Sequence, residues 1–244
     1  MQQGLFSIVS NEALTESVYK MTLSGDVSDI TAPGQFVNIL LEGKFLRRPI
    51  SVCDVQDGML TIIYKVVGKG TEQLSQMKNG SLDILTGLGN GYDLSVSGDR
   101  PVLIGGGVGV PPMYMLAKQL IEEGKSVKVI LGFNTCSEIF YENEFRDLGA
   151  EVIVTTVDGS YGMKGFVTDA MKDVEYTYFY TCGPEPMLKA VFKASSTSGQ
   201  MSFEKRMGCG FGACMGCSCK TITGYKRICK EGPVMRKEEI LWEN

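Results

Sequence analysis

Short apolar segments separated by turn residues dominate the first part of the chain, up to about residue 97. Pro33-Gly34, Asp57-Gly58 and Asn79-Gly80 are typical turn sequences, and Asp-Gly between two apolar segments favours a two-residue hairpin. Many short strands at close spacing predict a small antiparallel β-barrel. The expected strands cover residues 5–9, 17–23, 35–41, 50–53, 59–67 and 82–85.

From residue 99 onward the hydrophobic pattern alternates between strands and helices. An apolar run at 102–104 leads into a glycine-rich turn, and a helical stripe of apolar residues follows, closed by Gly124. This alternation predicts a parallel sheet covered by helices on both faces. Further strands are expected at 127–131, 152–156 and 178–181, and further helices around 139–148, 167–172 and 185–194.

These changes of pattern divide the chain into three expected units. A boundary near residue 98 separates the barrel (1–98) from the α/β domain (99–198), and a second boundary near residue 199 precedes a glycine- and cysteine-rich end (199–244). A chain of 244 residues is long enough to bury the cores of such an α+β multidomain protein.

The glycine-rich turn at 105–112 has the features of a phosphate site. It lies between a strand and a helix, where backbone N–H groups and the positive end of the helix dipole face an anion. The turn lacks the third glycine of the Rossmann fingerprint, so a tight structural turn without a ligand is the alternative. The candidate nucleotide-binding residues of this turn are Gly105, Gly106, Gly107, Gly109 and Pro112.

The charges after the second expected strand of this domain bear on the choice of nicotinamide cofactor. NADP enzymes usually place a basic residue near the adenine ribose to meet the 2′-phosphate. Residues 129–145 contain no Lys or Arg, whereas Glu138, Glu142 and Glu144 are acidic. This pattern favours NAD, while Arg146 or another loop would be the source of a cation for NADP.

Five of the eight cysteines lie in the last 36 residues. Cys209, Cys214 and Cys217 follow the spacing C-x₄-C-x₂-C, and Cys229 comes after eleven further residues, a pattern typical of plant-type 2Fe–2S clusters. Interspersed glycines suit a loop that wraps closely around sulfide. Cys219 is the alternative to Cys217 as third ligand, and zinc is the alternative to the cluster.

The composition narrows the chemistry further. The absence of histidine excludes Ser-His-Asp and Cys-His catalysis and histidine-ligated metals, so redox chemistry must come from bound cofactors. A net charge of −4 argues against a nucleic-acid partner. The sequence contains no run of 18 apolar residues, so no membrane span is predicted. The chain opens without the basic and apolar regions of a signal peptide, which predicts a cytoplasmic protein without disulfides. Cys53 and Cys136 are expected to be structural or incidental.

Four motifs together resemble the ferredoxin–NADP reductase superfamily: Arg48-Pro49-Ile50-Ser51, Gly68-x-Gly70-Thr71, the glycine-rich turn and Thr181-Cys182-Gly183-Pro184-x-x-Met187. The resemblance implies an FAD-binding β-barrel followed by a Rossmann-like nicotinamide domain. It places Arg48 at the FAD pyrophosphate, Ser51 near the flavin ring and Cys182 beside the nicotinamide, although a buried cysteine is often only a small apolar residue. The other residues implied in cofactor binding are Pro49, Ile50, Tyr64, Lys65, Val66, Gly70, Thr71, Gly183 and Pro184.

The order of FAD barrel, nicotinamide domain and small C-terminal 2Fe–2S domain is similar to that of the electron transfer subunits of NAD-dependent dihydroorotate dehydrogenase B. The segments 46–51, 158–165 and 229–234 also share the sequence pattern of that family. The resemblance implies an FMN-containing catalytic partner, in a heterotetramer of two plus two. Electrons from dihydroorotate would pass through the cluster and FAD to NAD⁺, as part of pyrimidine biosynthesis.

Two other functions fit the sequence less completely. One is an FAD/2Fe–2S subunit of another NAD(P)H oxidoreductase, of the sulfide dehydrogenase or ferredoxin:NADP oxidoreductase type. The other, from a different class, is a zinc-stabilised binding module without catalysis. A zinc module would leave the flavin and nicotinamide motifs without a role.

Overall fold

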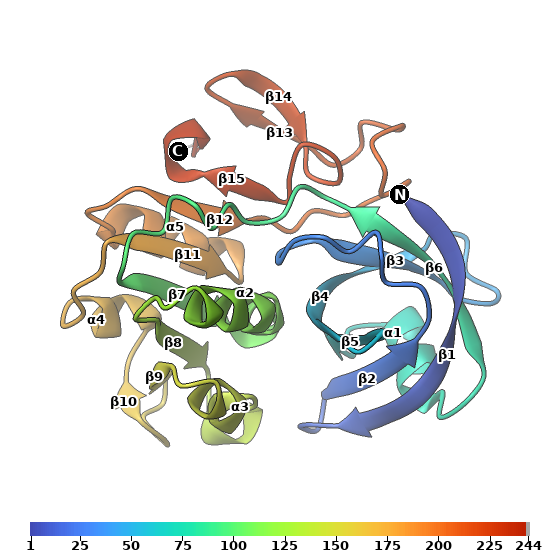
Figure 1. The fold of residues 1–244 in the computed structure, drawn as a ribbon, viewed down its shortest axis with the longest axis horizontal. Coiled ribbons are helices and arrows are strands. Elements are labelled where there is room, and N and C mark those ends of the chain that lie inside the picture. The colour runs from blue at the N-terminus through green and yellow to red at the C-terminus, as the bar shows by residue number, and fades with distance from the viewer. Residues whose placement is uncertain (243–244) are drawn as a thin grey trace.

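The computed structural model describes residues 1–242 and begins with the expected barrel. Six antiparallel strands close in the order β1-β2-β5-β4-β3-β6 (Figure 1). All six expected strands are present, and several run longer than their apolar cores. They are β1 (Gln2–Ala13), β2 (Val18–Ser24), β3 (Phe36–Leu40), β4 (Arg48–Gln56), β5 (Met59–Lys65) and β6 (Ser81–Leu88).

The predicted Asp-Gly hairpin joins β4 to β5. Asp57 and Gly58 both have left-handed backbone angles, with φ of 52° and 74°, as a two-residue hairpin turn requires. Inside the barrel, alternate residues of the strands build one apolar core, which includes Leu23, Ile39 and Ile62. The short helix α1 (Lys69–Gln76) follows β5 and buries Leu74 in the same core.

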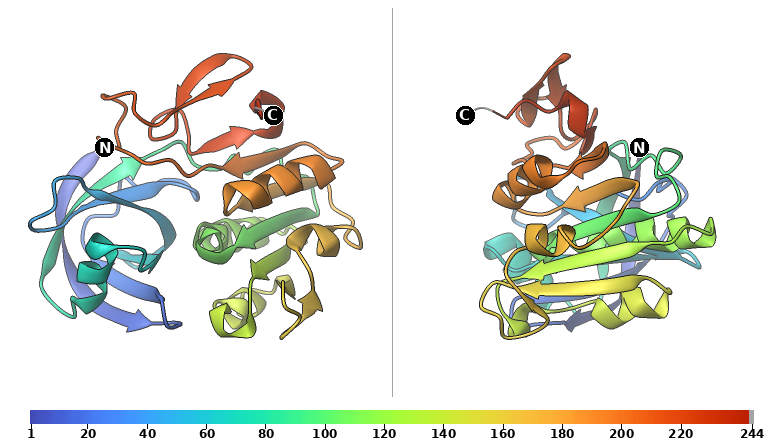
Figure 2. Two further views of the ribbon diagram at one scale, coloured as in Figure 1. Left: turned by 180° about the vertical axis from the view of Figure 1, so that it is seen from behind. Right: turned by 90° about the vertical axis from the view of Figure 1, so that its left-hand side faces the viewer.

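The second half of the chain forms a seven-stranded sheet in the order β10-β9-β8-β7-β11-β12-β15. Its neighbours pair in parallel except for β12 and β15, which are antiparallel. Helices cover both faces, as the alternating pattern predicts (Figure 2). The strands are β7 (Pro101–Gly106), β8 (Lys128–Phe133), β9 (Glu151–Thr156), β10 (Met163–Lys164), β11 (Tyr178–Cys182), β12 (Gly199–Ser202) and β15 (Val234–Arg236).

The helices of this unit divide between two buried clusters, one on each face of the sheet. α2 (Pro111–Glu122) and α3 (Glu142–Asp147) contribute to one cluster, and α4 (Val167–Met171) and α5 (Glu185–Ala194) to the other. Gly124 follows α2 with a φ of 78°, the left-handed conformation expected just after a helix. No helix within residues 1–242 is long and apolar enough to cross a membrane.

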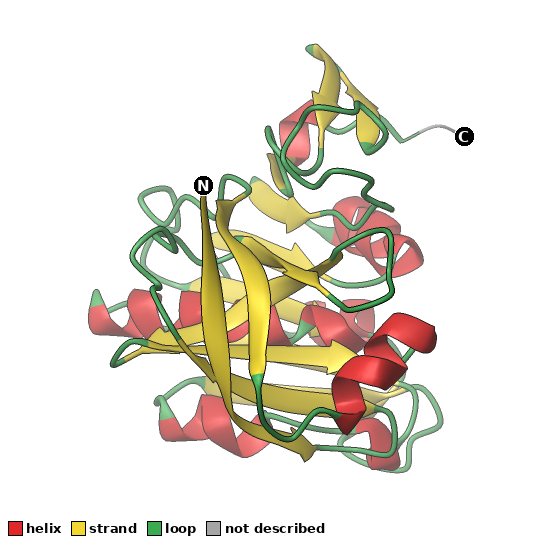
Figure 3. Cartoon of the chain, turned by 90° about the vertical axis from the view of Figure 1, so that its right-hand side faces the viewer, coloured by secondary structure: helices red, strands yellow, loops and turns green. Residues whose placement is uncertain are grey.

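The cysteine-rich stretch projects from the edge of the sheet. Because β12 and β15 are both strands of the sheet, the stretch between them is tethered to the sheet at its two ends (Figure 3). It contains one small hairpin, β13 (Ser218–Thr221) and β14 (Gly224–Arg227). We use the name cysteine segment for residues 203–233, which lie between β12 and β15.

The barrel and the sheet are packed against each other. Met115 of α2 belongs to the apolar core of the barrel, and Cys53 and Ile63 of the barrel belong to a core cluster of the sheet. Lys118 Nζ of α2 also pairs with the Asp54 carboxylate of β4 at 3.2 Å, and both side chains are largely buried. This shared core holds the two halves in a fixed relation, so a cleft between them has defined walls.

Candidate functional site

Two adjoining cavities occupy the cleft between barrel and sheet. We use the name flavin cavity for the one of about 520 Å³, which is lined mainly by the barrel and by residues 202–207. We use the name nicotinamide cavity for the other, of about 680 Å³, which is lined mainly by the turns that follow β7, β8 and β11. Lys65, Val108 and Glu204 line both cavities, so ligands in the two cavities would meet at this junction.

One end of the flavin cavity is suited to a pyrophosphate. A Cβ on Gly70 would lie only 2.3 Å from Arg48 Nε, so the guanidinium rests directly on the first turn of α1. The Thr71 hydroxyl accepts hydrogen bonds from the N–H groups of Val67 (2.9 Å) and Gly68 (3.3 Å), which orders the start of the helix. An arginine beside a helix N-terminus provides charge and N–H donors for phosphate oxygens.

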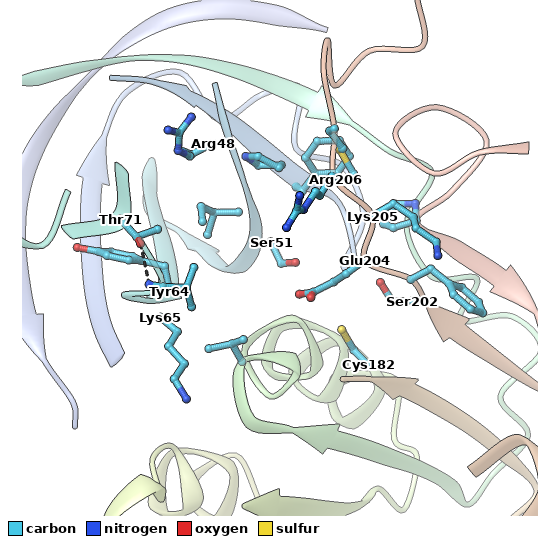
Figure 4. A pocket seen from close by; sticks show the side chains of 18 of the residues that line it. Arg48, Ser51, Tyr64, Lys65, Thr71, Cys182, Ser202, Glu204, Lys205 and Arg206 are labelled. Atoms are coloured by element: carbon cyan, nitrogen blue, oxygen red, sulfur yellow. Dashed lines mark hydrogen bonds between the residues drawn. The ribbon is translucent and has the colours of Figure 1, made fainter. Parts of the chain in front are cut away.

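The other end of the flavin cavity carries both charged and uncharged polar side chains. Ser51 and Cys182 face this space, with Glu204 between them (Figure 4). Burial raises the pKa of the Cys182 thiol to about 12, so this side chain is neutral at physiological pH. Tyr64, also in the lining, donates its hydroxyl to Asn11 Oδ1 at 2.9 Å, and burial raises its pKa to about 12.

The flavin cavity also has lining residues that the motifs did not indicate. These are Glu204, Lys205 and Arg206, which lie at the start of the cysteine segment, just after β12. Lys205 reaches outward to the Glu185 carboxylate at 3.6 Å, whereas the Arg206 guanidinium points toward Ser51 (Figure 4). Desolvation in the cleft raises the pKa of the Glu204 carboxyl. The position of these three residues shortly before Cys209 is the one sequence signal that could have identified them.

The glycine-rich turn after β7 packs its glycines closely against neighbouring chain segments. A Cβ on Gly106 would lie 2.4 Å from Met187 Sδ, and one on Gly109 would lie 2.2 Å from the Cys182 carbonyl oxygen. Gly107 instead faces open space with a φ of +51°. Gly106 and Gly109 therefore fit the interpretation as a tight structural turn, and Gly107 leaves the space that the ligand-binding interpretation requires.

The nicotinamide cavity lies where the strand order of the sheet reverses. After β7 the chain builds β8 and β9 on one side, and then returns to build β11 on the other side of β7. Crevices at the carboxyl ends of strands at such a switch point are the usual nucleotide sites of α/β sheets. Gly183 and Pro184, which follow β11, line the cavity on the side opposite to β8.

The far end of the nicotinamide cavity is acidic. Glu138 lines it, and its Oε2 accepts hydrogen bonds from the backbone N–H (3.1 Å) and Nδ2 (2.9 Å) of Asn134. Arg146, the considered source of a cation for NADP, is engaged instead with Glu142 (2.8 Å) and the Val152 carbonyl oxygen (3.1 Å). These contacts favour a ribose hydroxyl over a 2′-phosphate at this end.

Four of the predicted cofactor residues are not in the lining of either cavity. Gly70 supports Arg48, and Gly105 packs against Val110, where a Cβ would lie 2.9 Å from its Cα. Val66 donates its N–H to the Ser17 carbonyl oxygen at 2.8 Å, and Pro112 is buried in the first turn of α2. The lining contains the remaining predicted residues, Arg48, Pro49, Ile50, Ser51, Tyr64, Lys65, Thr71, Gly106, Gly107, Gly109, Cys182, Gly183 and Pro184.

The four predicted ligand cysteines fall into two pairs. Cys209 Sγ accepts hydrogen bonds from the N–H groups of Ala213 (3.2 Å) and Cys214 (3.4 Å). Cys217 Sγ accepts the N–H of Cys229 at 3.4 Å. Although desolvation opposes ionisation of Cys209, the surrounding N–H donors lower its pKa to about 6.

This pairing fits two iron atoms better than one zinc ion. A structural zinc ion is held by four ligands around one point, whereas the contacts here join the cysteines two by two. A 2Fe–2S cluster held by four cysteines has two irons, and two pairs of thiols match that requirement. Cys219 is turned elsewhere, with its Sγ 3.9 Å from Met235 Sδ, which supports Cys217 as the third ligand.

Comparison with known proteins places these sites in one family. Residues 204–241 match the iron–sulfur cluster binding domain of dihydroorotate dehydrogenase B, and residues 103–193 match the oxidoreductase NAD-binding domain. The electron transfer subunit of dihydroorotate dehydrogenase B (NAD⁺) from Geobacillus sp. (strain WCH70) is 41% identical over an alignment of 256 residues that covers 99% of both chains. The same subunit from Bacillus pumilus (strain SAFR-032) is 43% identical, with 98% of both chains covered.

A solved structure agrees with this placement. The NADH-dependent reduced ferredoxin-NADP oxidoreductase, described in connection with flavin-based electron bifurcation, has a TM-score of 0.88 and 32% identity. It covers 98% of this chain and 90% of its own. These matches confirm the expected fold class, the oxidoreductase assignment and the expected cofactors FAD, 2Fe–2S and NAD. The chain belongs to the family of electron transfer subunits of NAD-dependent dihydroorotate dehydrogenase B.

Proposed function

We propose that this chain accepts electrons from an FMN-containing dihydroorotate dehydrogenase subunit and delivers them to NAD⁺. Electrons enter at a 2Fe–2S cluster on Cys209, Cys214, Cys217 and Cys229, and leave from the nicotinamide cavity. FAD, when bound in the flavin cavity, supplies the chemistry that joins single-electron transfer to hydride transfer. The remaining steps need only binding and orientation by the protein, which agrees with the absence of histidine.

One observation carries this proposal: Phe36 of β3 belongs to both sites. Its side chain lines the flavin cavity, and it shares a buried cluster with Cys217 and Cys229. A buried apolar cluster that includes Phe36 therefore connects the flavin cavity with two of the four predicted ligand cysteines. The nicotinamide cavity adjoins the flavin cavity on its other side, at Lys65, Val108 and Glu204. The three sites thus follow one another in the order that an electron relay needs.

The side chains around the cleft have distinct tasks in this proposal. Arg48 and the N-terminus of α1 hold the FAD pyrophosphate, and the open Gly107 lets the nicotinamide dinucleotide approach the turn after β7. Cys182, kept neutral by burial, places no negative charge beside the hydride that must move toward NAD⁺. The packed glycines fix the turn so that the nicotinamide ring meets the flavin ring at the junction.

An electron transfer subunit works with a catalytic partner, and the surface around the cysteines is suited to one. Cys214 is exposed, and the apolar side chains of Phe211 and Met215 are 43% and 53% exposed beside it. Exposed apolar residues next to a cluster site favour docking of another protein surface. We infer that this is the face toward the FMN-containing subunit, within a heterotetramer of two plus two.

The direct test is to co-express the chain with a dihydroorotate dehydrogenase catalytic subunit and to assay NAD⁺ reduction. The complex should reduce NAD⁺ with dihydroorotate, whereas the chain alone should oxidise NADH only with an artificial dye. An iron-free chain that contains zinc, or dihydroorotate oxidation by the chain alone, would contradict the proposal.

A second candidate function follows from the solved relative. Its TM-score of 0.88 over nearly the whole chain supports an alternative role as a subunit that serves a ferredoxin:NADP oxidoreductase. The partner purified with the native chain separates the two. An FMN-binding barrel enzyme supports the dihydroorotate reaction, and a large flavoprotein of the glutamate synthase type supports the alternative.

A further inference from the structure

Strand β3 of the barrel presents two side chains to the cysteine segment. Phe36 shares a buried cluster with Cys217 and Cys229, and Asn38 lies on the same side of the strand because side chains alternate. Asn38 is 1% exposed, and its Nδ2 donates a hydrogen bond to the Cys209 carbonyl oxygen at 3.2 Å. One strand of the FAD barrel therefore contacts both pairs of cysteines.

The backbone at Asn38 is itself held in place. Arg47 Nη1 donates to the carbonyl oxygens of Asn38 (3.2 Å) and Asp83 (3.1 Å), and Arg47 Nη2 pairs with the Asp83 carboxylate at 2.8 Å. The strand pairs with β4 on one side and β6 on the other. Asn38 therefore projects from a rigid support toward a loop that has little regular structure of its own.

Gly210 fits closely against this asparagine. A Cβ at Gly210 would lie 2.3 Å from Asn38 Nδ2, and its φ of +80° belongs to the left-handed region that favours glycine. The contact is therefore specific on both sides, since the loop offers a carbonyl oxygen and leaves out a side chain where the asparagine reaches it.

The hydrogen bond fixes the orientation of the peptide group between Cys209 and Gly210. This peptide is trans, so its N–H points opposite to its C=O. The same bond holds the backbone of Cys209, whose Sγ accepts hydrogen bonds from the N–H groups of Ala213 and Cys214. Hydrogen bonds to the sulfurs are one of the factors that set the potential of an iron–sulfur cluster.

Stability alone does not account for an asparagine at this position. Its Oδ1 is buried and has no hydrogen-bond partner among residues 1–242. Burying this unpaired acceptor is unfavourable, and leucine would avoid that cost, although it would leave the Cys209 carbonyl oxygen without its donor. What leucine could not provide is the donor to the Cys209 carbonyl.

We propose that Asn38 is a positioning residue for electron transfer, which holds the Cys209 backbone so that the N–H groups of Ala213 and Cys214 reach the Cys209 Sγ and raise the reduction potential of the cluster. This inference rests on the proposed function, because it requires a 2Fe–2S cluster in the cysteine segment. Asn38 makes the FAD barrel a part of the cluster environment, and so matches the potential of the cluster to the flavin next to it.

The test uses the full chain loaded with FAD and cluster. Asn38→Leu should lower the cluster potential, measured by redox titration with EPR, enough to shift the one-electron equilibrium between FAD and cluster at least tenfold, about 59 mV. The thermal midpoint should change little, because the lost hydrogen bond and the removed unpaired acceptor have opposite effects, and reduction of FAD by NADH should keep its rate. An unchanged potential in cluster-loaded Asn38→Leu would overturn the proposal.

Further variants keep the proposal testable if Asn38→Leu fails to load its cluster. Asn38→Ser shortens the side chain, and Gly210→Ala pushes the loop away from the other side; both should shift the potential in the same direction. Asn90→Ser is the matched control, since Asn90 also binds backbone of the cysteine segment, at Glu231 (3.2 Å), and of β15, at Val234 (2.7 Å), but touches no cysteine. An equal shift of the potential in Asn90→Ser would mean that the effect of the Asn38 variants comes from general loosening of the cysteine segment. An iron-free wild-type chain would instead refute the proposed function itself.

Discussion

The nucleotide cleft and the cysteine segment achieve precise geometry by different means. The cleft is bounded by strand ends in fixed register and by glycines packed at van der Waals contact or closer, so the ladders of the sheet and barrel set its shape. Between β12 and β15 the cysteine segment has only one hairpin of its own. It is held by side chains: Asn38 and Asn90 from the barrel unit, and Arg227, which donates to the Gly212 carbonyl oxygen at 2.6 Å and pairs with Glu231.

This difference suggests what each region tolerates. In the turns of the cleft, position comes from the packing of the backbone, so substitutions that add atoms to their glycines should be damaging, apart from the loss of a side chain such as Arg48 that binds a ligand. In the cysteine segment, position comes from individual side chains, so substitutions that remove a donor or a thiol should be the damaging ones. The following variants test this distinction.

The largest effect is expected at Cys217. Cys217→Ser should abolish the cluster, because the Cys217 Sγ lies next to Cys229 and accepts its N–H, whereas Cys219→Ser should retain the cluster, because the Cys219 Sγ lies against Met235. Iron content and the visible absorption of the purified protein measure this. Retention in Cys217→Ser together with loss in Cys219→Ser would reverse the assignment of the third ligand.

Arg48 should have the next largest effect, on FAD binding. Hydrogen bonds to charged groups contribute about 1.5–3 kcal/mol, so Arg48→Met should weaken FAD binding roughly 10- to 150-fold. Fluorescence titration of the deflavinated protein measures the affinity. Arg100→Met is the control, since Arg100 is exposed and pairs with Glu175 far along the sheet. Equal losses in both variants would contradict the phosphate role of Arg48.

A smaller loss is expected from a single added methyl group in the glycine-rich turn. Gly109→Ala would place a Cβ 2.2 Å from the Cys182 carbonyl oxygen, and overpacking of this kind costs about 1–3 kcal/mol. The thermal midpoint should fall, and reduction of FAD by NADH should slow because the turns after β7 and β11 are forced apart. Gly4→Ala on β1, where the new Cβ would meet Phe6 at an ordinary 3.5 Å, should change neither quantity.

The smallest effect is expected at the acidic end of the nicotinamide cavity. Replacing Glu138 with Gln removes a carboxylate that would repel a 2′-phosphate, so the preference for NADH over NADPH should fall roughly fivefold, as about 1 kcal/mol from an exposed charge implies. Steady-state dye reduction with each nucleotide measures the ratio. Glu151→Gln, which affects an exposed carboxylate that pairs with Lys128 outside both cavities, should leave the ratio unchanged.

Local sequence patterns predicted much of the fold and part of the site. Three features depend on short-range turn and cap chemistry, which the sequence encodes locally. They are the Asp57-Gly58 hairpin, the strand–turn–helix that begins at residue 101, and the left-handed Gly124 that follows α2. The family and fold class were also confirmed. The roles of the individual site residues stay predictions that the variants above address.

Long-range pairing explains what the sequence did not reveal. Glu204, Lys205 and Arg206 reach the flavin cavity because β12 pairs with β11, twenty positions earlier in the chain, and with β15, more than thirty positions later. Asn38 looks like an ordinary strand residue until the fold brings Cys209 against it. Conversely, Val66 and Pro112 stand next to motif residues in the sequence, but their structural roles lie in the barrel pairing and in the start of α2.

The relay itself is tested most directly by following both half-reactions in the reconstituted complex with Cys217→Ser. NADH should still bleach the flavin of this variant at the wild-type rate, because the nicotinamide and flavin cavities are untouched. Dihydroorotate-dependent reduction of NAD⁺ should disappear, because the entry point for electrons is lost. A Cys217→Ser complex that lacks iron but reduces NAD⁺ with dihydroorotate at the wild-type rate would contradict the account.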